Sequence, residues 1–344
     1  MLKSVELLIN LGYSKKEAED ITSSYPLVNL KDETLCKKIN ENFNYLIDLG
    51  YTKPDAIKMT KHFPSLYSYN KETIEEKISF LISLGYTKSD VIKMTKLLPV
   101  LFSYSKENIE EKMVFLISLG YKKADVIKMT KLLPSLYSYN KETIEEKISF
   151  LISLGYTKPD VIKMTKLLPA LYSHSKENIK GKISFLISLG YTMIDIIKMT
   201  NQFPALYSLS KETIEEKILF LISLDYTKSD VIKMTKILPS LYGYSKENIE
   251  DKIKYLIEIN LNCIVVNDTK KLMQSVSLTY ARYEFLTKEK GIIIDETNYY
   301  KLFCRETQFK KQYGISKNML LKKYSYEDYR ENKKCLIKKN QFNC

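Results

Sequence analysis

The chain has 344 residues, of which 44% are hydrophobic and 28% are charged, and this composition excludes an intrinsically disordered protein. Its net charge is +13 at pH 7, but residues 301–344 carry twelve Lys/Arg against four Asp/Glu, so most of the excess positive charge lies in the C-terminal tail. There is no run of eighteen apolar residues, so no membrane-spanning helix is expected.

The cysteines and the N-terminal residues further limit the class of protein that this sequence encodes. The five cysteines, Cys36, Cys263, Cys304, Cys335 and Cys344, have no paired spacing, so we predict free thiols and neither a disulfide framework nor a zinc site. The first twenty residues lack the apolar block of a signal peptide and contain four acidic residues, which argues against a transit peptide. We expect a soluble intracellular protein without a cofactor, in a compartment that the sequence does not specify.

A 35-residue repeat organises residues 36–245, and a capping repeat precedes it at residues 1–35. Tyrosines after Leu-Gly or Leu-Asp recur at this spacing: Tyr51, Tyr86, Tyr121, Tyr156, Tyr191 and Tyr226. Seven of the nine prolines recur with them: Pro26, Pro64, Pro99, Pro134, Pro169, Pro204 and Pro239. Units of this length cannot bury their apolar faces alone, so the sequence predicts stacked units that share one core.

Each unit contains the signals of two helices and a turn. In one unit, Asn70 is a candidate N-cap for a first helix, and Gly85 is placed to end it. Thr87 and Asp90 have the spacing of a capping box that opens a second helix. Pro99 forbids continuation of that helix, and the six residues from Pro99 onward are too few for an α-helix, so we predict a 3₁₀ turn there.

The C-terminal part departs from this pattern. Residues 246–280 form a degenerate last repeat, with Leu261 at the tyrosine position, and residues 281–344 form a divergent basic segment. Residues 318–323 favour a short helix, and we expect the chain to fray beyond Tyr329. The fold class predicted is all-α, a right- or left-handed solenoid of about eight 35-residue repeats, each with two α-helices and a 3₁₀ turn.

The repeat resembles that of the mitochondrial transcription termination factor (mTERF) family. The similarity rests on Leu-Gly-Tyr, on Asp-Val-Ile-Lys-Met at 90–94 and on Leu-Pro-x-Leu at 98–101, and it extends over roughly residues 1–280. Arg-Tyr-Glu-Phe-Leu at 282–286 is similar to a segment that follows the last repeat in that family. The resemblance implies a superhelix whose basic groove binds double-stranded DNA or structured RNA, in organelle transcription, RNA processing or ribosome biogenesis.

Lysines on the second helices are the candidate binding residues. They stand three residues apart on the polar face, and stacking of the units would align them in a ladder that neutralises phosphates. Arg282 joins them through the family resemblance. The predicted nucleic-acid-binding set is Lys58, Lys61, Lys93, Lys96, Lys128, Lys131, Lys163, Lys166, Lys198, Lys233, Lys236 and Arg282.

These lysines admit a second interpretation. The first helices carry a matching acidic ladder, such as Glu72, Glu75 and Glu76, so charges nearly cancel within a unit, and exposed Lys and Glu often only solvate a helix. The alternative function is therefore a protein-interaction scaffold that presents a polar groove to a protein partner. Separation of the two signs between the two helices favours nucleic acid, because a groove lined by one helix type presents one sign.

Other patterns are less informative. The inter-unit turns carry Tyr69, Tyr104, Tyr139, His174, Leu209 and Tyr244 at one repeat position. These side chains could stack on bases, but Leu209 fits packing better. The chain has only two histidines and no glycine-rich phosphate loop, and Asp90 is explained as a helix cap, so no enzyme is expected. We expect a monomeric, non-catalytic protein that binds double-stranded nucleic acid and no membrane.

Overall fold

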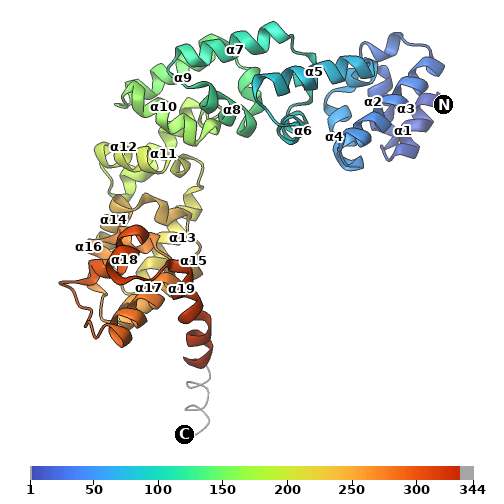
Figure 1. Cartoon of the computed structure of the whole chain (residues 1–344). Helices are drawn as coiled ribbons and strands as arrows, with labels where there is room; N and C mark the ends of the chain where they lie inside the picture. The colour runs from blue at the N-terminus through green and yellow to red at the C-terminus, as the bar shows by residue number, and fades with distance from the viewer. Residues whose placement is uncertain (1, 334–344) are drawn as a thin grey trace. The chain divides into compact units, whose positions relative to one another are not determined.

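The computed structural model describes residues 2–333, and these residues form α-helices, 3₁₀ helices and one π-helical turn, without a β-strand (Figure 1). The fold class predicted from the sequence, an all-α repeat solenoid, is confirmed. The chain divides into two compact units, Met1–Lys176 and Glu177–Cys344. The division falls inside the regular repeats, so each compact unit contains both regular repeats and one end of the array.

The first compact unit alternates first helices, second helices and 3₁₀ turns. Its elements are α1 (Lys3–Leu11), α2 (Lys15–Ser23), η1 (Leu27–Asn29), α3 (Asp32–Leu49), α4 (Lys53–His62), η2 (Pro64–Ser68), α5 (Lys71–Leu84), α6 (Lys88–Leu97), η3 (Pro99–Ser103), α7 (Lys106–Ser118), α8 (Lys123–Leu132), η4 (Pro134–Tyr137), α9 (Lys141–Ser153), α10 (Lys158–Leu167) and η5 (Pro169–Tyr172). Beyond the α1–α3 pair, successive second helices contact one another more closely than successive first helices do.

The second compact unit continues the order and then leaves it. Its elements are α11 (Lys176–Leu189), α12 (Met193–Gln202), η6 (Pro204–Tyr207), α13 (Lys211–Ile222), α14 (Lys228–Ile237), η7 (Pro239–Gly243), α15 (Lys246–Glu258), α16 (Cys263–Asn267), η8 (Thr269–Met273), α17 (Val276–Glu284), the π-helical turn η9 (Phe285–Glu289), η10 (Tyr299–Phe303), α18 (Glu306–Tyr313) and α19 (Lys317–Lys323). Residues 326–333 form a further helix, the C-terminal helix.

The helix boundaries follow the predicted signals. Thr87 and Asp90 form the capping box, in which the Thr87 side chain accepts from the Asp90 N–H at 3.1 Å and Asp90 accepts from the Thr87 N–H at 3.0 Å. Gly85 ends α5 with φ 115°, a conformation that suits glycine, and Pro99 opens η3. Asn70 makes no side-chain cap, whereas Asn140 at the same repeat position accepts from the Thr143 N–H.

The repeat tyrosines join neighbouring repeats. Tyr86 is 2% exposed, and its hydroxyl lies 2.6 Å from the Thr130 hydroxyl and 2.7 Å from that of Tyr137. Thr130 donates to the Val126 carbonyl, so the Tyr86 hydroxyl donates to Thr130 and accepts from Tyr137. All three hydroxyls are therefore satisfied in the core. The repeat tyrosines are therefore packed in the core rather than exposed.

A buried lysine closes each repeat from α5 to α15. Lys77 on α5 is 9% exposed, and its ammonium group donates to the carbonyl of Tyr104 at the end of η3. Burial lowers the pKa of Lys77. The same bond, to the residue 27 positions later, recurs at Lys112, Lys147, Lys182 and Lys217, and in the degenerate last repeat Lys252 donates to Leu272. These bonds satisfy carbonyls where a 3₁₀ turn leaves them without a helical partner.

The C-terminal end is more ordered than expected. Residues 330–333 are helical, and Arg330 bonds Asp251 at 2.9 Å, which anchors the C-terminal helix. The fraying predicted beyond Tyr329 is therefore wrong for these four residues. Cys335, Cys344 and the lysines from 334 onward lie outside the described residues.

The helices were also compared with the requirements for a membrane span. Within residues 2–333, no single helix is both long and apolar enough to cross a bilayer. Only α11 and α12 taken together, with a bend of 116° between them, meet the length and composition requirement.

Candidate nucleic-acid interface

The predicted lysines lie on α4, α6, α8 and α10 of the first compact unit and on α12 and α14 of the second. The structure separates them into two groups that differ in their contacts. The bridging lysines are Lys61, Lys96, Lys131, Lys166 and Lys236, and each pairs with a carboxylate of the preceding repeat. The outer lysines are Lys58, Lys93, Lys128, Lys163, Lys198 and Lys233, all exposed to solvent.

The bridging lysines reach the aspartates that cap the second helices. The Lys131 ammonium lies 3.0 Å from Asp90, and the two side chains are 39% and 14% exposed. Lys96 lies 2.8 Å from Asp55 in the same arrangement. Each ion pair therefore joins the last turn of one second helix to the first turn of the previous one. A bridging lysine carries little free positive charge, because its partner carboxylate neutralises it.

Two of the partner aspartates, Asp55 and Asp90, have lowered pKa values. The Thr87 N–H, assisted by the Lys131 ammonium, holds the pKa of Asp90 at about 2. Lys96 is the main group that lowers the pKa of Asp55. The bridges are consequently intact at neutral pH, where a phosphate would have to compete with a bound carboxylate for the same lysine.

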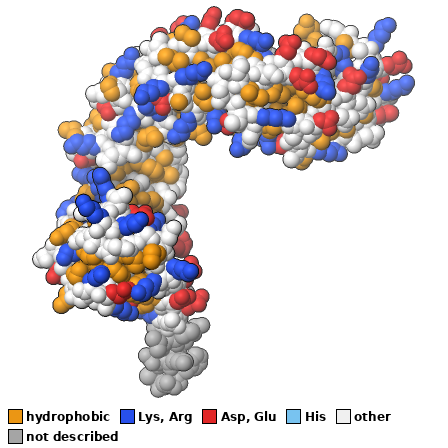
Figure 2. All heavy atoms as spheres, viewed as in Figure 1, with side chains coloured by type: hydrophobic (Ala, Val, Ile, Leu, Met, Phe, Trp, Pro, Cys, Tyr) orange, Lys and Arg blue, Asp and Glu red, His pale blue; other side chains and the backbone are white. Residues whose placement is uncertain are grey.

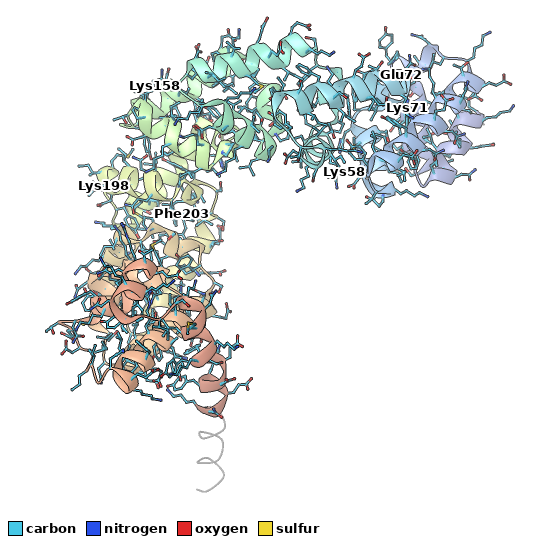
Figure 3. The ribbon with its side chains drawn as sticks, viewed as in Figure 1. Lys58, Lys71, Glu72, Lys158, Lys198 and Phe203 are labelled. Carbon is cyan, nitrogen blue, oxygen red and sulfur yellow. The ribbon has the colours of Figure 1, made fainter. Side chains whose placement is uncertain are left out.

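The outer lysines have different surroundings. Lys58, Lys93, Lys128 and Lys163 make no ion pair or side-chain hydrogen bond with any residue between 2 and 333, and they recur every 35 residues on neighbouring second helices. In the second compact unit Lys198 is equally exposed, while Lys233 donates to the Asn267 side chain at 2.7 Å. Figure 3 shows Lys58 on α4 and Lys198 on α12. The outer lysines are thus available to an anion.

The comparison with known families agrees with the geometry. The family model mTERF matches residues 1–153 and residues 136–264, well over half of the chain. The chain belongs to the mTERF family. No curated protein matches the sequence. Proteins of the mTERF family are in general non-catalytic helical repeat proteins that bind nucleic acids.

One predicted residue of this mTERF chain is not at the surface. Arg282 is 2% exposed, and its guanidinium donates to the carbonyls of Leu302 and Cys304, both at 2.8 Å, and stacks 4.4 Å from the centre of the Phe309 ring. The expectation that Arg282 contacts nucleic acid does not fit this position. The guanidinium instead satisfies carbonyls of the loop that follows α17, and we remove it from the interface.

Exposed leucines flank the outer lysines, and the sequence analysis did not single them out. Leu97, Leu132 and Leu167 end their second helices with 67%, 59% and 55% exposure. Each stands four residues after an outer lysine and so shares its helix face. Figure 2 shows Lys and hydrophobic side chains interspersed on the surface of the first compact unit. The face of these mTERF helices is therefore cationic and partly apolar.

The turn position that holds Tyr69 and His174 does not form an exposed stacking platform in the mTERF array. All six side chains at this position are partly buried. Tyr69 packs edge-on against Phe63 at 5.9 Å, and the Tyr244 ring lies 5.0 Å from the Lys252 ammonium. These contacts support packing as the main role of the position. Within residues 2–333, no group of three or more His, Cys, Asp or Glu side chains could hold a metal ion.

Proposed function

We propose that the chain binds the phosphate backbone of double-stranded DNA or structured RNA through the outer lysines, in transcription or RNA metabolism. The observation that supports this is the recurrence of four exposed lysines without partners, Lys58, Lys93, Lys128 and Lys163, on the closely packed side of the first compact unit. Phosphates spaced along a duplex favour an array of point charges of this kind. Family membership supports the same conclusion.

The bridging lysines have a supporting role in this proposal. Pairing with Asp55, Asp90 or Asp125 fixes the spacing of neighbouring second helices, and this spacing sets the distance between outer lysines. The proposal therefore divides the predicted ladder of eleven lysines into residues that contact phosphate and residues that hold the repeats in register. One repeat position varies and holds Ser89, Ala124, Pro159, Ile194 and Ser229; none of these is an Asn, Gln or Arg that could read base edges, which favours binding that tolerates many sequences.

The test compares two triple variants of equal charge change. Lys93, Lys128 and Lys163 are replaced by Gln in one variant, and Lys96, Lys131 and Lys166 in the other. Binding of labelled duplex DNA, duplex RNA and single strands is measured from about 50 to about 300 mM salt. Each phosphate contact contributes roughly 0.9 to the slope of log K against log salt, so the outer variant should lose about 2.7 of that slope.

The bridging variant should keep the slope and lose thermal stability instead. The preferred substrate then distinguishes DNA from RNA. Absence of duplex binding at low salt, or an equal loss of slope in both variants, would refute the phosphate-contact role of the outer lysines.

The exposed leucines favour a second candidate, a scaffold that binds a protein through the same face. Leu97, Leu132 and Leu167 are more than half exposed and stand beside outer lysines, so a partner that covers both would bury apolar area as well as pair charge. Replacement of the three leucines by Ser distinguishes the two. Duplex affinity should change little if phosphates are the ligand, because the leucines carry no charge.

A further inference from the structure

The first helices carry a surface of opposite sign, with hollows between successive helices. Between α7 and α9 lies an open hollow of about 450 Å³, lined by Glu107, Glu110, Glu111, Val114, Phe115 and Lys141. The next hollow, of about 520 Å³, is lined by three glutamates of α9, by Phe150 and by Lys176. Each hollow therefore holds three carboxylates, one ammonium group and a half-buried aromatic ring.

Exposed apolar side chains lie on the same helices. Val114, which lines the hollow between α7 and α9, is 66% exposed, and Ile82, Ile117 and Ile152 on α5, α7 and α9 are 41%, 41% and 42% exposed at one repeat position. The hollows exist because successive first helices contact one another less than successive second helices do. The result is an acidic groove with an apolar floor along the first helices.

The second compact unit contains an occupied form of the same groove. Tyr255 on α15 stands at the repeat position of Phe115, nine residues after the lysine that opens each first helix. Its ring is contacted by Tyr326 and Tyr329 of the C-terminal helix, with centroids 5.7 and 6.3 Å away, and Tyr255 is only 3% exposed. The C-terminal helix therefore covers on α15 the aromatic position that is half-buried beside a hollow on α7 and α9.

One acidic position of the occupied groove follows the same register. Asp251 stands at the repeat position of Glu111 and Glu146, and it pairs with Arg330 of the C-terminal helix at 2.9 Å. Lys333 pairs with Glu258, two turns further along α15, at 2.6 Å. The acidic side chain that receives Arg330 thus has an exposed counterpart in each open hollow.

The contacting residues of the C-terminal helix form one stripe. Tyr326, Tyr329, Arg330 and Lys333 stand at positions i, i+3, i+4 and i+7, which lie on a single helix face. The acidic residues of this helix, Glu327, Asp328 and Glu331, are exposed. Recognition therefore requires two aromatic side chains followed by two cations on one face, and tolerates acidic residues elsewhere.

We propose that the open grooves on α7 and α9 bind an amphipathic helix of a partner protein that presents two aromatic residues followed by Arg and Lys in this spacing. The partner's rings cover Phe115 or Phe150, and its arginine pairs with Glu111 or Glu146. Lys141, whose ammonium lies 5.9 Å from the Phe115 ring, moves aside at small cost, since an exposed cation–π contact contributes about 0.5 to 1 kcal/mol. This surface is separate from the outer lysines and of opposite charge.

The experiment measures fluorescence anisotropy of a labelled helical peptide that repeats the Tyr-x-x-Tyr-Arg-x-x-Lys stripe, titrated with the full chain. The variant is Glu111→Lys with Glu146→Lys. Its matched control is Glu6→Lys with Asp20→Lys, an equal charge change at two exposed positions of α1 and α2. A second peptide, with Glu in place of Arg and Lys, reports whether the cations are required.

Saturable binding is expected, weakened about ten-fold or more by the groove variant and by the second peptide, and unchanged by the matched control. Duplex affinity of the groove variant should not fall, so the result is independent of the proposed function. Absence of saturable binding, or an equal loss in the matched control, would overturn the proposal. Self-association of the chain that the groove variant abolishes would also overturn it, because the occupant would then be a second copy.

Discussion

The regular repeats and the C-terminal region use different cations to satisfy buried backbone carbonyls. In a regular repeat, Lys112 reaches across to one carbonyl, that of Tyr139. In the C-terminal region, Arg282 reaches the carbonyls of Leu302 and Cys304 and the side chain of Gln274. The repeat turn returns with a fixed spacing of 27 residues, so one point donor suffices, whereas the irregular loop after α17 requires the planar fork of a guanidinium. Regularity reduces the number of bonds that each closure needs.

The largest loss of stability is expected for Arg282→Ala. The substitution removes the guanidinium donor of two carbonyls, of which Leu302 keeps the Gln274 amide, and opens a cavity beside Phe309, so it should destabilise the second compact unit by about 3 kcal/mol. Hydrogen exchange of residues 276–303 measures it. Lys112→Ala is the matched change in a regular repeat and should cost about half as much, because one carbonyl is lost. Equal losses would contradict the difference between the two closures.

Removal of a repeat tyrosine hydroxyl should cost less stability, and two tyrosines with different numbers of bonds can be compared. Tyr86→Phe removes the central hydroxyl of a chain of three and should cost about 1 to 2 kcal/mol. Tyr51→Phe should cost less, because Tyr51 bonds Thr95 alone and Phe102 occupies the position of the second tyrosine. Thermal unfolding compares the two variants. The comparison fails if Tyr51→Phe is the more damaging, or if Phe102→Tyr destabilises the chain.

Acid should destabilise the regular repeats by protonating the aspartates that cap their second helices. Asp90 has a pKa of about 2 in the folded chain, below the usual value near 3.9 in an unfolded chain, so its contribution is complete above roughly pH 5 and is lost as the pH falls toward 2. Asp90→Asn should reduce the loss of melting temperature between about pH 5 and pH 2.5. An unchanged pH dependence would show that Asp90 is not linked to folding.

The smallest loss of stability is expected when a bridging lysine is replaced. Lys131→Met keeps the aliphatic chain and removes an ion pair that is partly exposed, so it should cost only about 0.5 kcal/mol. The difference from the native chain should shrink as salt is added, since salt screens such a pair. Melting curves at low and high salt measure it. A loss comparable with that of Arg282→Ala would mean that the bridges carry far more of the stability than their exposure allows.

The local structure of the repeats was predictable because its signals are short in range. Gly85, the Thr87–Asp90 pair and Pro99 each act within a few residues, and each helix boundary that they predicted is present. The buried lysines had a local signal that was missed. Lys77 stands with Ile74 and Ile78 in the apolar stripe of α5, where a solvating lysine would not be placed.

The division of the candidate lysines could not be predicted. Lys58 and Lys61 look alike in sequence, and only the stacking of repeats decides which one meets a carboxylate of the previous repeat. The same holds for Arg282, whose carbonyl partners belong to a loop without a repeat pattern. Contacts between elements far apart in sequence depend on packing geometry, which periodicity alone does not supply.

The constant spacing of these contacts has a consequence for how such a gene can change. Tyr86 meets hydroxyls 44 and 51 residues later, and Lys131 meets a carboxylate 41 residues earlier, with the same residue types one repeat further on. Excision of residues 106–140 by recombination would bring Thr165 and Tyr172 to the places of Thr130 and Tyr137. The copy number of repeats can therefore change by unequal crossover without the evolution of a new junction.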